Sequence, residues 1–139
     1  MRKRGQIDEK PLSGIVLIVE DSLLLAMDAE DIVRNLGAAQ VEFAGTVKAA
    51  LEWLESTKFE FVILDVTLGI ETTYCVVPVL EAKRTPYIVT TGEDDAVAMM
   101  DMFPGAMFVS KPYDEAGIAD VIIETKALLA EWTGGEGDD

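Results

Sequence analysis

The segment IVLIVED, residues 15–21, places five aliphatic residues directly before two acids. The run is rich in β-branched residues and too short for a buried helix, so it predicts a strand. A second segment of the same kind, FVILD at residues 61–65, again ends on an acid. Continuous apolar strands are typical of a parallel sheet that is covered by helices on both faces.

Three more short segments complete the strand pattern. Residues 87–89 and 107–109 are apolar runs like the first two. In residues 40–44, Val41 and Phe43 alternate with polar residues, which predicts a strand with one more exposed face. The sequence therefore predicts five strands.

Helical spacing of apolar residues appears between the strands. The first helix is expected to begin after Ser22 and to stop at Gly37, and Thr46 is expected to cap the second. A last helix should begin after Asp114. Two further helices are expected at 71–82, where Pro78 interrupts the pattern, and at 93–102; both are expected to be short, kinked or partly loop.

Strand and helix thus alternate five times, which predicts an α/β fold with a doubly wound, five-stranded parallel sheet and helices on both faces. We expect one domain over residues 13–133, a flexible N-terminal segment at 1–12 and a disordered acidic tail at 134–139. No second pattern of elements follows Trp132, so no attached output domain is expected.

Composition excludes several classes of function. The 139-residue chain has no histidine, which removes the Ser-His-Asp and Cys-His arrangements and the usual zinc sites. Its formal net charge of -15 opposes nucleic-acid binding, since that affinity rests mainly on Lys and Arg. No apolar stretch approaches the roughly 20 residues of a membrane span, so a soluble, cytoplasmic protein is expected. The single Cys75 is expected to be a buried or half-buried structural thiol.

Four of the predicted strands end on polar residues. Parallel strands bring their carboxyl ends to one edge of a sheet, where ligands bind. The residues expected to meet there are Glu20, Asp21, Asp65, Thr91 and Lys111.

Three neighbouring carboxylates repel one another unless a cation neutralises them, and Mg²⁺ suits such oxygen ligands. Asp21 and Asp65 are candidates for direct ligands, Glu20 for a ligand through water, and the backbone carbonyl near Thr67 for one more. Lys111 supplies a positive charge that can pair with Asp65 or with a phosphoryl group. Taken singly, each of these side chains would more often be a cap, a turn residue or a surface charge. Their arrival at equivalent strand ends favours a function.

With these residues in place, the sequence resembles response-regulator receiver domains from about residue 15 to about residue 132. The resemblance implies a flavodoxin-like fold with strand order 2-1-3-4-5 and a phosphoryl group accepted on Asp65 from a histidine kinase. It assigns Glu20 and Asp21 as the acidic pair, Lys111 as the phosphate-contacting lysine, and Thr91 and Phe108 as the switch residues. Such a protein catalyses only its own phosphorylation and dephosphorylation.

A single receiver domain can pass its signal only through its own surface. We expect protein contacts around the fourth helix, the fifth strand and the fifth helix, or else a phosphate sink that competes for one kinase. No nucleic acid and no membrane are expected as partners.

The segment PYIVTTG at residues 86–92 resembles the alphaproteobacterial FATGUY group of single-domain regulators. The chain keeps the proline, an aromatic residue, the threonine and the glycine of that group's signature. It has Val89 and Thr90 in place of a Phe-Ala pair and Glu93 in place of an aromatic residue. It also has Gly69 where common receivers carry a proline.

Two alternatives remain beside this interpretation. A pseudo-receiver would keep the fold as a protein-binding module without turning over phosphate, although the complete set of site residues argues against it. A haloacid-dehalogenase-like phosphatase also forms an aspartyl-phosphate beside Mg²⁺. It needs a second acid two residues after the first, and this chain has Thr67 there.

Overall fold

The computed structural model describes residues 10–92, 103, 106–111 and 113–136. The helix expected at 93–102 and most of the expected N-terminal segment therefore lie outside the described residues. The elements, in chain order, are β1 (Ile15–Val19), α1 (Leu23–Asn35), β2 (Gln40–Ala44), α2 (Val47–Ser56), β3 (Phe61–Asp65), β4 (Thr67–Leu68), β5 (Glu71–Thr72), the 3₁₀ helix η1 (Tyr74–Val76), α3 (Val77–Ala82), β6 (Tyr87–Thr91), β7 (Met107–Ser110) and α5 (Glu115–Glu136).

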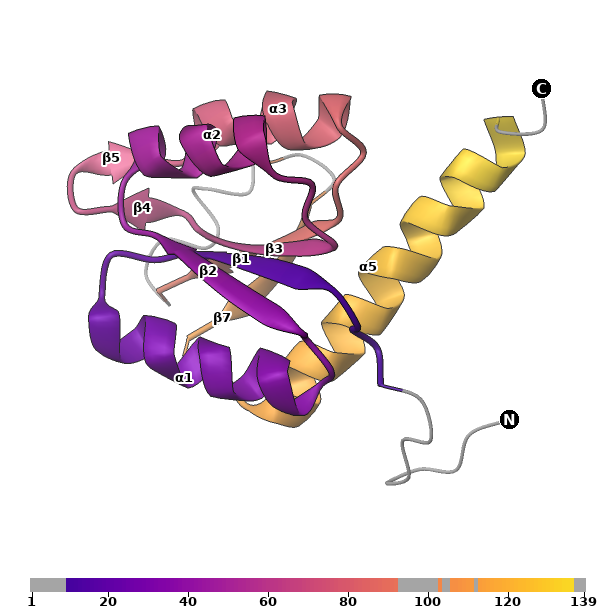
Figure 1. Ribbon diagram of the computed structural model, residues 1–139, viewed down its shortest axis with the longest axis horizontal. Helices are drawn as coiled ribbons and strands as arrows, with labels where there is room; N and C mark the ends of the chain where they lie inside the picture. The colour runs from indigo at the N-terminus through magenta and orange to yellow at the C-terminus, as the bar shows by residue number, and fades with distance from the viewer. Residues whose placement is uncertain (1–9, 93–102, 104–105, 112, 137–139) are drawn as a thin grey trace.

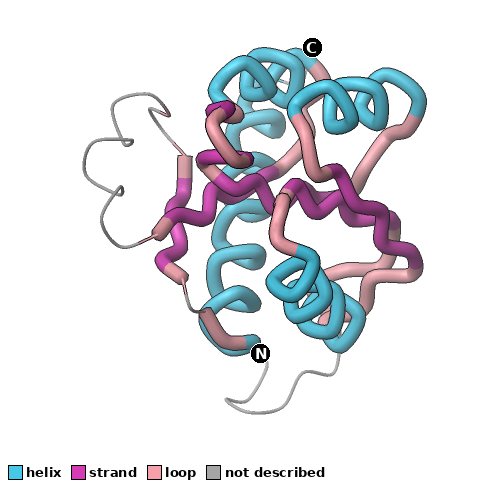
Figure 2. Tube along the Cα trace, turned by 90° about the vertical axis from the view of Figure 1, so that its left-hand side faces the viewer, coloured by secondary structure: helices cyan, strands magenta, loops and turns pink. Residues whose placement is uncertain are grey.

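Five parallel strands form the central sheet, in the order β2-β1-β3-β6-β7. Because β6 and β7 are its fourth and fifth strands along the chain, this is the predicted order 2-1-3-4-5. Helices α1 and α5 cover one face, and α2 and α3 cover the other (Figures 1 and 2). The predicted doubly wound α/β fold is confirmed.

The apolar strands fill two cores, one on each face of the sheet. In β1, Val16 and Ile18 belong to the core under α1 and α5, whereas Leu17 and Val19 belong to the core under α2 and α3. Successive side chains of a strand point to opposite faces. This double burial accounts for the unbroken run of aliphatic residues at 15–19.

The predicted helix boundaries rest on identifiable caps. The hydroxyl oxygens of Ser22 and Thr46 accept hydrogen bonds from the third residue after each, at 3.3 and 3.0 Å. Gly37, at the end of α1, has φ of +114°, a conformation that costs glycine little. Asp114 accepts a bond from the amide of Gly117 at 2.8 Å at the start of α5.

The helix expected at 71–82 is short and covers only part of that range, as predicted, but Pro78 does not interrupt it. Strands β4 and β5 form an antiparallel hairpin after β3, and the α-helix is confined to α3. Pro78 lies in the first turn of α3, where the missing amide hydrogen breaks no helical bond, so it starts the helix rather than interrupting it. Cys75 lies in η1 and is exposed, so the expectation of a buried or half-buried thiol was wrong.

Strand β2 and the end of helix α5 also differ in detail from the prediction. Strand β2 lies at an edge of the sheet, and of its two alternating apolar residues Val41 is buried whereas Phe43 is 40% exposed. Helix α5 runs to Glu136 and therefore includes the first residues of the segment expected as a tail. Within the described part of the chain, none of the helices combines the length and apolar character of a membrane span.

Candidate functional site

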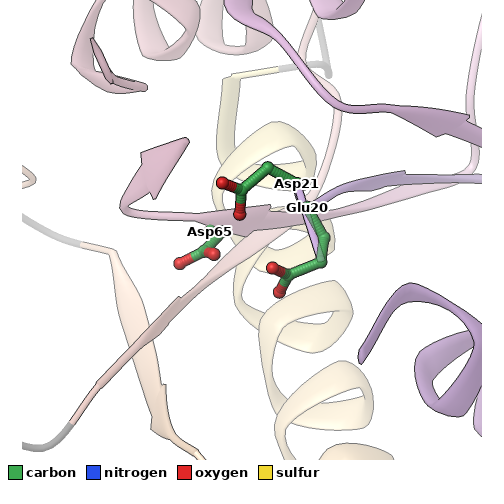
Figure 3. Close-up of side chains that lie close together, drawn as sticks. All are labelled: Glu20, Asp21 and Asp65. Atoms are coloured by element: carbon green, nitrogen blue, oxygen red, sulfur yellow. The ribbon is translucent and has the colours of Figure 1, made fainter. Parts of the chain in front are cut away.

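Three carboxylates meet at the carboxyl ends of two adjacent strands. Glu20 and Asp21 follow β1, and Asp65 is the last residue of β3, which pairs with β1 in parallel. Each carboxylate offers an oxygen, and these oxygens lie within 4.8 Å of one another (Figure 3). The sheet therefore brings together the acids that the sequence singled out.

Lys111 reaches the same place from the end of β7. Its Nζ donates to Glu20 Oε1 at 2.8 Å and to Asp65 Oδ2 at 2.9 Å. Glu20 and Asp65 are only 8% and 6% exposed, so one ammonium group serves two nearly buried carboxylates. Such an arrangement leaves an excess of negative charge at the site, which favours a bound cation.

The electrostatics of the site follow from burial and from this shared charge. Burial raises the pKa of Asp65 to about 6; the Lys111 hydrogen bond opposes this rise, and the neighbouring charge of Glu20 adds to it. Burial acts to lower the pKa of Lys111, but its bonds to Glu20 and Asp65 outweigh burial and raise it. Burial and then the charge of Glu20 raise the pKa of Tyr113, which lies near the site.

Asp21 is the exposed member of the acid group. Its Oδ2 accepts a hydrogen bond from the amide of Gly69, at the turn of the β4–β5 hairpin, at 2.8 Å. The other acid of the pair is fixed locally, because the amide of Ser22 donates to Glu20 Oε2 at 3.1 Å. Asp21 is thus accessible to solvent and tied to the hairpin.

The remaining predicted site residues lie around this centre. The hydroxyl of Thr91 is buried at the end of β6 and donates to the carbonyl of Gly92 at 2.7 Å. Phe108 is half-buried in β7 and packs edge-on against Phe103, with ring centroids 6.1 Å apart. Thr67 lies in β4, two residues after Asp65.

One buried residue of the site escaped the sequence analysis. Thr73 is fully buried, and its hydroxyl donates to the carbonyl of Asp65 at 2.7 Å, with the carbonyl oxygen of Val66 3.2 Å away. The segment was expected to be helical, so nothing in the sequence placed Thr73 beneath the acceptor loop. The hairpin that contains Gly69 was missed for the same reason.

The sequence profile of the response regulator receiver domain matches residues 16–123. The chain belongs to this family. A search of curated protein sequences found no significant match.

Several solved structures resemble this one, receiver domains among them. SdrG from Sphingomonas melonis is 31% identical with a TM-score of 0.70, and the match covers 86% of this chain and 97% of SdrG. The receiver domain of PhyR from Erythrobacter litoralis is 28% identical with a TM-score of 0.69, covering 83% and 91%. The receiver domain of the sensor kinase PA1611 from Pseudomonas aeruginosa is 20% identical with a TM-score of 0.66, covering 88% and 98%. The structure of PA1611 has a magnesium ion coordinated in its active-site cleft.

Receiver domains are signalling modules of two-component systems and are generally not enzymes that act on other substrates. They bind Mg²⁺ at an acidic site, and the acid group of this receiver has the oxygen-rich chemistry that Mg²⁺ requires. They also interact with histidine kinases and other proteins.

Proposed function

We propose that this receiver domain accepts a phosphoryl group on Asp65 from the phosphohistidine of a histidine kinase and passes the signal on by protein contacts. The observation that carries the proposal is the position of Asp65, whose carboxylate lies within 4.8 Å of those of the acidic pair and accepts a hydrogen bond from the ammonium group of Lys111. The proposed location of this reaction is the cytoplasm.

Asp65 must be a carboxylate to attack phosphorus. With a pKa of about 6 it is mostly ionised at pH 7, and Lys111 orients its Oδ2. When the phosphoryl group arrives, the Lys111 ammonium can move from the carboxylate to a phosphoryl oxygen and balance the added charge.

Asp21, Asp65 and the backbone carbonyl of Thr67 are the proposed direct ligands of Mg²⁺, and Glu20 is proposed to act through water. The three closely spaced carboxylates fit a hard divalent cation. When bound, Mg²⁺ would neutralise phosphoryl oxygens and so lower the barrier to transfer. Asp21 is exposed, which leaves the site open to solvent and to a partner.

Exposed apolar side chains beside the acids support a protein as phosphodonor. Leu23 and Leu24 are 75% and 71% exposed in the first turn of α1, which follows the acidic pair after Ser22. Ile70 is fully exposed at the hairpin turn, next to the Gly69 amide that binds Asp21. A kinase surface that delivers its phosphohistidine to Asp65 would cover these side chains.

The proposed output depends on Thr91 and Phe108. A phosphoryl group on Asp65 would draw the Thr91 hydroxyl away from Gly92 and make room for the Phe108 ring to turn inward. The receiving surface would comprise β7, α5 and the segment 93–102, the last of which lies outside the described residues. The alternative to this switch is a phosphate sink, in which the protein only competes for the kinase.

Residues 86–92 support a further proposal, that this receiver belongs to the FATGUY group.

Acetyl phosphate with Mg²⁺ tests the acceptor. The wild type should gain one phosphoryl mass and Asp65→Asn none, while Asp120→Asn, which removes an exposed acid from α5, should be labelled like the wild type. Equal labelling of Asp65→Asn would refute the assignment. Profiling transfer from purified histidine kinases would then identify the donor.

Beryllofluoride, a mimic of the phosphoryl group, separates the switch from the sink. NMR shift changes that extend from Asp65 to Phe108 and α5 would support the switch. Shift changes confined to the acid group would exclude the switch and support the phosphate sink.

A further inference from the structure

Thr73 closes the base of the loop that follows the acceptor aspartate. Its hydroxyl lies 2.7 Å from the carbonyl oxygen of Asp65 and 3.2 Å from that of Val66. Its backbone amide also donates to the Val66 carbonyl at 2.9 Å. The hydroxyl and the amide of this one buried residue thus hold the carbonyl of the last residue of β3 and the carbonyl of the residue that follows it.

A threonine in this position would ordinarily cap the following helix. Thr73 directly precedes η1, and capping residues accept hydrogen bonds from the first amides of a helix. The Thr73 side chain makes no such bond. Its hydroxyl points back to β3 instead, so its contacts serve the acceptor loop rather than the helix.

The far end of the same loop contacts the acid group. The amide of Gly69, in the hairpin turn, donates to Asp21 Oδ2 at 2.8 Å. The chain from Asp65 to Gly69 therefore connects two of the three carboxylates, and it includes Thr67, the proposed carbonyl ligand. Thr73 holds this connection at its base, and Asp21 holds it at its turn.

We propose that Thr73 is a positioning residue for the phosphorylation site, whose hydroxyl fixes the loop of residues 65–69 and thereby sets the relative placement of Asp65, the Thr67 carbonyl and Asp21. Its effect on metal binding and phosphorylation rests on the proposed function. Its effect on the loop itself does not.

Replacing the hydroxyl by a methyl group isolates this role. Thr73→Val keeps the shape of the side chain but leaves the Asp65 carbonyl without its donor. Because the net contribution of one hydrogen bond corresponds to a change of very roughly fivefold in an equilibrium constant, Mg²⁺ affinity should fall by on the order of fivefold. The rate of phosphorylation by acetyl phosphate at low Mg²⁺ should fall with it.

Amide exchange in the metal-free protein gives a readout that needs neither metal nor phosphate. The Gly69 amide should exchange with solvent faster in Thr73→Val, by on the order of fivefold, because the loop that holds it against Asp21 loses a contact at its base. Thr73→Ser keeps the hydroxyl and should restore wild-type exchange and Mg²⁺ affinity.

Val41→Ala is the matched control for lost stability. It truncates a buried side chain of β2, on the edge strand of the sheet and away from the loop. If Val41→Ala, compared under conditions where all variants are fully folded, changed Mg²⁺ affinity and Gly69 exchange as much as Thr73→Val, the positioning role would be wrong.

The outcomes for the two proposals are separable. If the wild type binds Mg²⁺ and is phosphorylated but Thr73→Val matches it in affinity and exchange, the inference about Thr73 fails and the proposed function stands. If the wild type neither binds Mg²⁺ nor accepts a phosphoryl group, the proposed function fails. In that case Gly69 exchange alone decides the role of Thr73: faster exchange in Thr73→Val supports it, and unchanged exchange overturns it.

Discussion

Asp65→Asn should stabilise the metal-free protein at neutral pH, although it removes the proposed acceptor. Burial raises the pKa of Asp65 from its ordinary value of 3.8 to about 6, so its ionised form is disfavoured in the folded state. Between these two pH values the folded protein binds a proton that the unfolded chain has released, and stability therefore falls as pH rises from about 4 to about 6. Above that range the loss is complete and constant.

The size of the effect follows from the same pKa. One pKa unit corresponds to about 1.4 kcal/mol, so the ionised carboxylate of Asp65 lowers the free energy of unfolding by about 3 kcal/mol at pH 7. Asparagine still offers an oxygen to Lys111, whose second bond to Glu20 at 2.8 Å is unaffected. Allowing for an imperfect amide replacement, we expect Asp65→Asn to raise the free energy of unfolding by about 2 kcal/mol at pH 7 and to change it little at pH 4.

Urea unfolding in the presence of a chelator, at pH 4, 5, 6, 7 and 8, measures this difference. Asp120→Asn removes the same charge from an exposed position on α5 and should change stability by less than about 0.5 kcal/mol. Saturating Mg²⁺ should stabilise the wild type but not Asp65→Asn, by about 2.7 kcal/mol at one hundred times the dissociation constant. A metal-free Asp65→Asn variant that is less stable than the wild type at pH 7, or a stability gain independent of pH, would refute the reasoning.

Three further predictions concern Mg²⁺ binding and the packing of the fold. Asp21→Ala should lose most of the Mg²⁺-dependent rise in melting temperature while keeping its metal-free fold, and a full rise in this variant would contradict the site. Glu60→Gln should lower the free energy of unfolding, measured in urea at pH 7, by about 1 kcal/mol, a value reduced for screening by solvent. Burial acts to raise the pKa of Glu60, but the hydrogen bonds that its carboxylate accepts outweigh burial and hold the pKa below its ordinary value. The largest of these contributions is the bond from Lys126. The stability that Glu60 contributes is present above the ordinary pKa of 4.5 and is lost as pH falls through the lower folded pKa, so an equal cost at pH 3 would be inconsistent with it. Gly37→Ala should lower the free energy of unfolding by about 2 kcal/mol or more. The reason is that a Cβ would lie 2.0 Å from the Leu12 carbonyl oxygen, at a backbone φ of +114°. A free energy of unfolding in urea within about 0.5 kcal/mol of the wild type would argue against this clash.

The sequence by itself determined the layered fold and the location of the site. Short, continuous apolar runs rich in β-branched residues are typical of strands in a covered parallel sheet, and parallel strands bring their carboxyl ends to one edge. The acids at the ends of two such runs, Glu20, Asp21 and Asp65, were therefore expected at the same edge of the sheet. The caps Ser22 and Thr46 were also readable, because a cap contacts residues only three positions away.

Only the tertiary structure showed which groups share these charges and what holds the acceptor loop. The sequence predicted that Lys111 can pair with Asp65, but its second bond is to Glu20, 91 residues away along the chain, and sequence spacing does not encode that partner. The β4–β5 hairpin and the buried hydroxyl of Thr73 were hidden in a segment whose local pattern favoured a helix. Local patterns report short-range preferences, whereas the conformation of this loop is determined by contacts with β3 and with the acid group, which exist only once the sheet has formed.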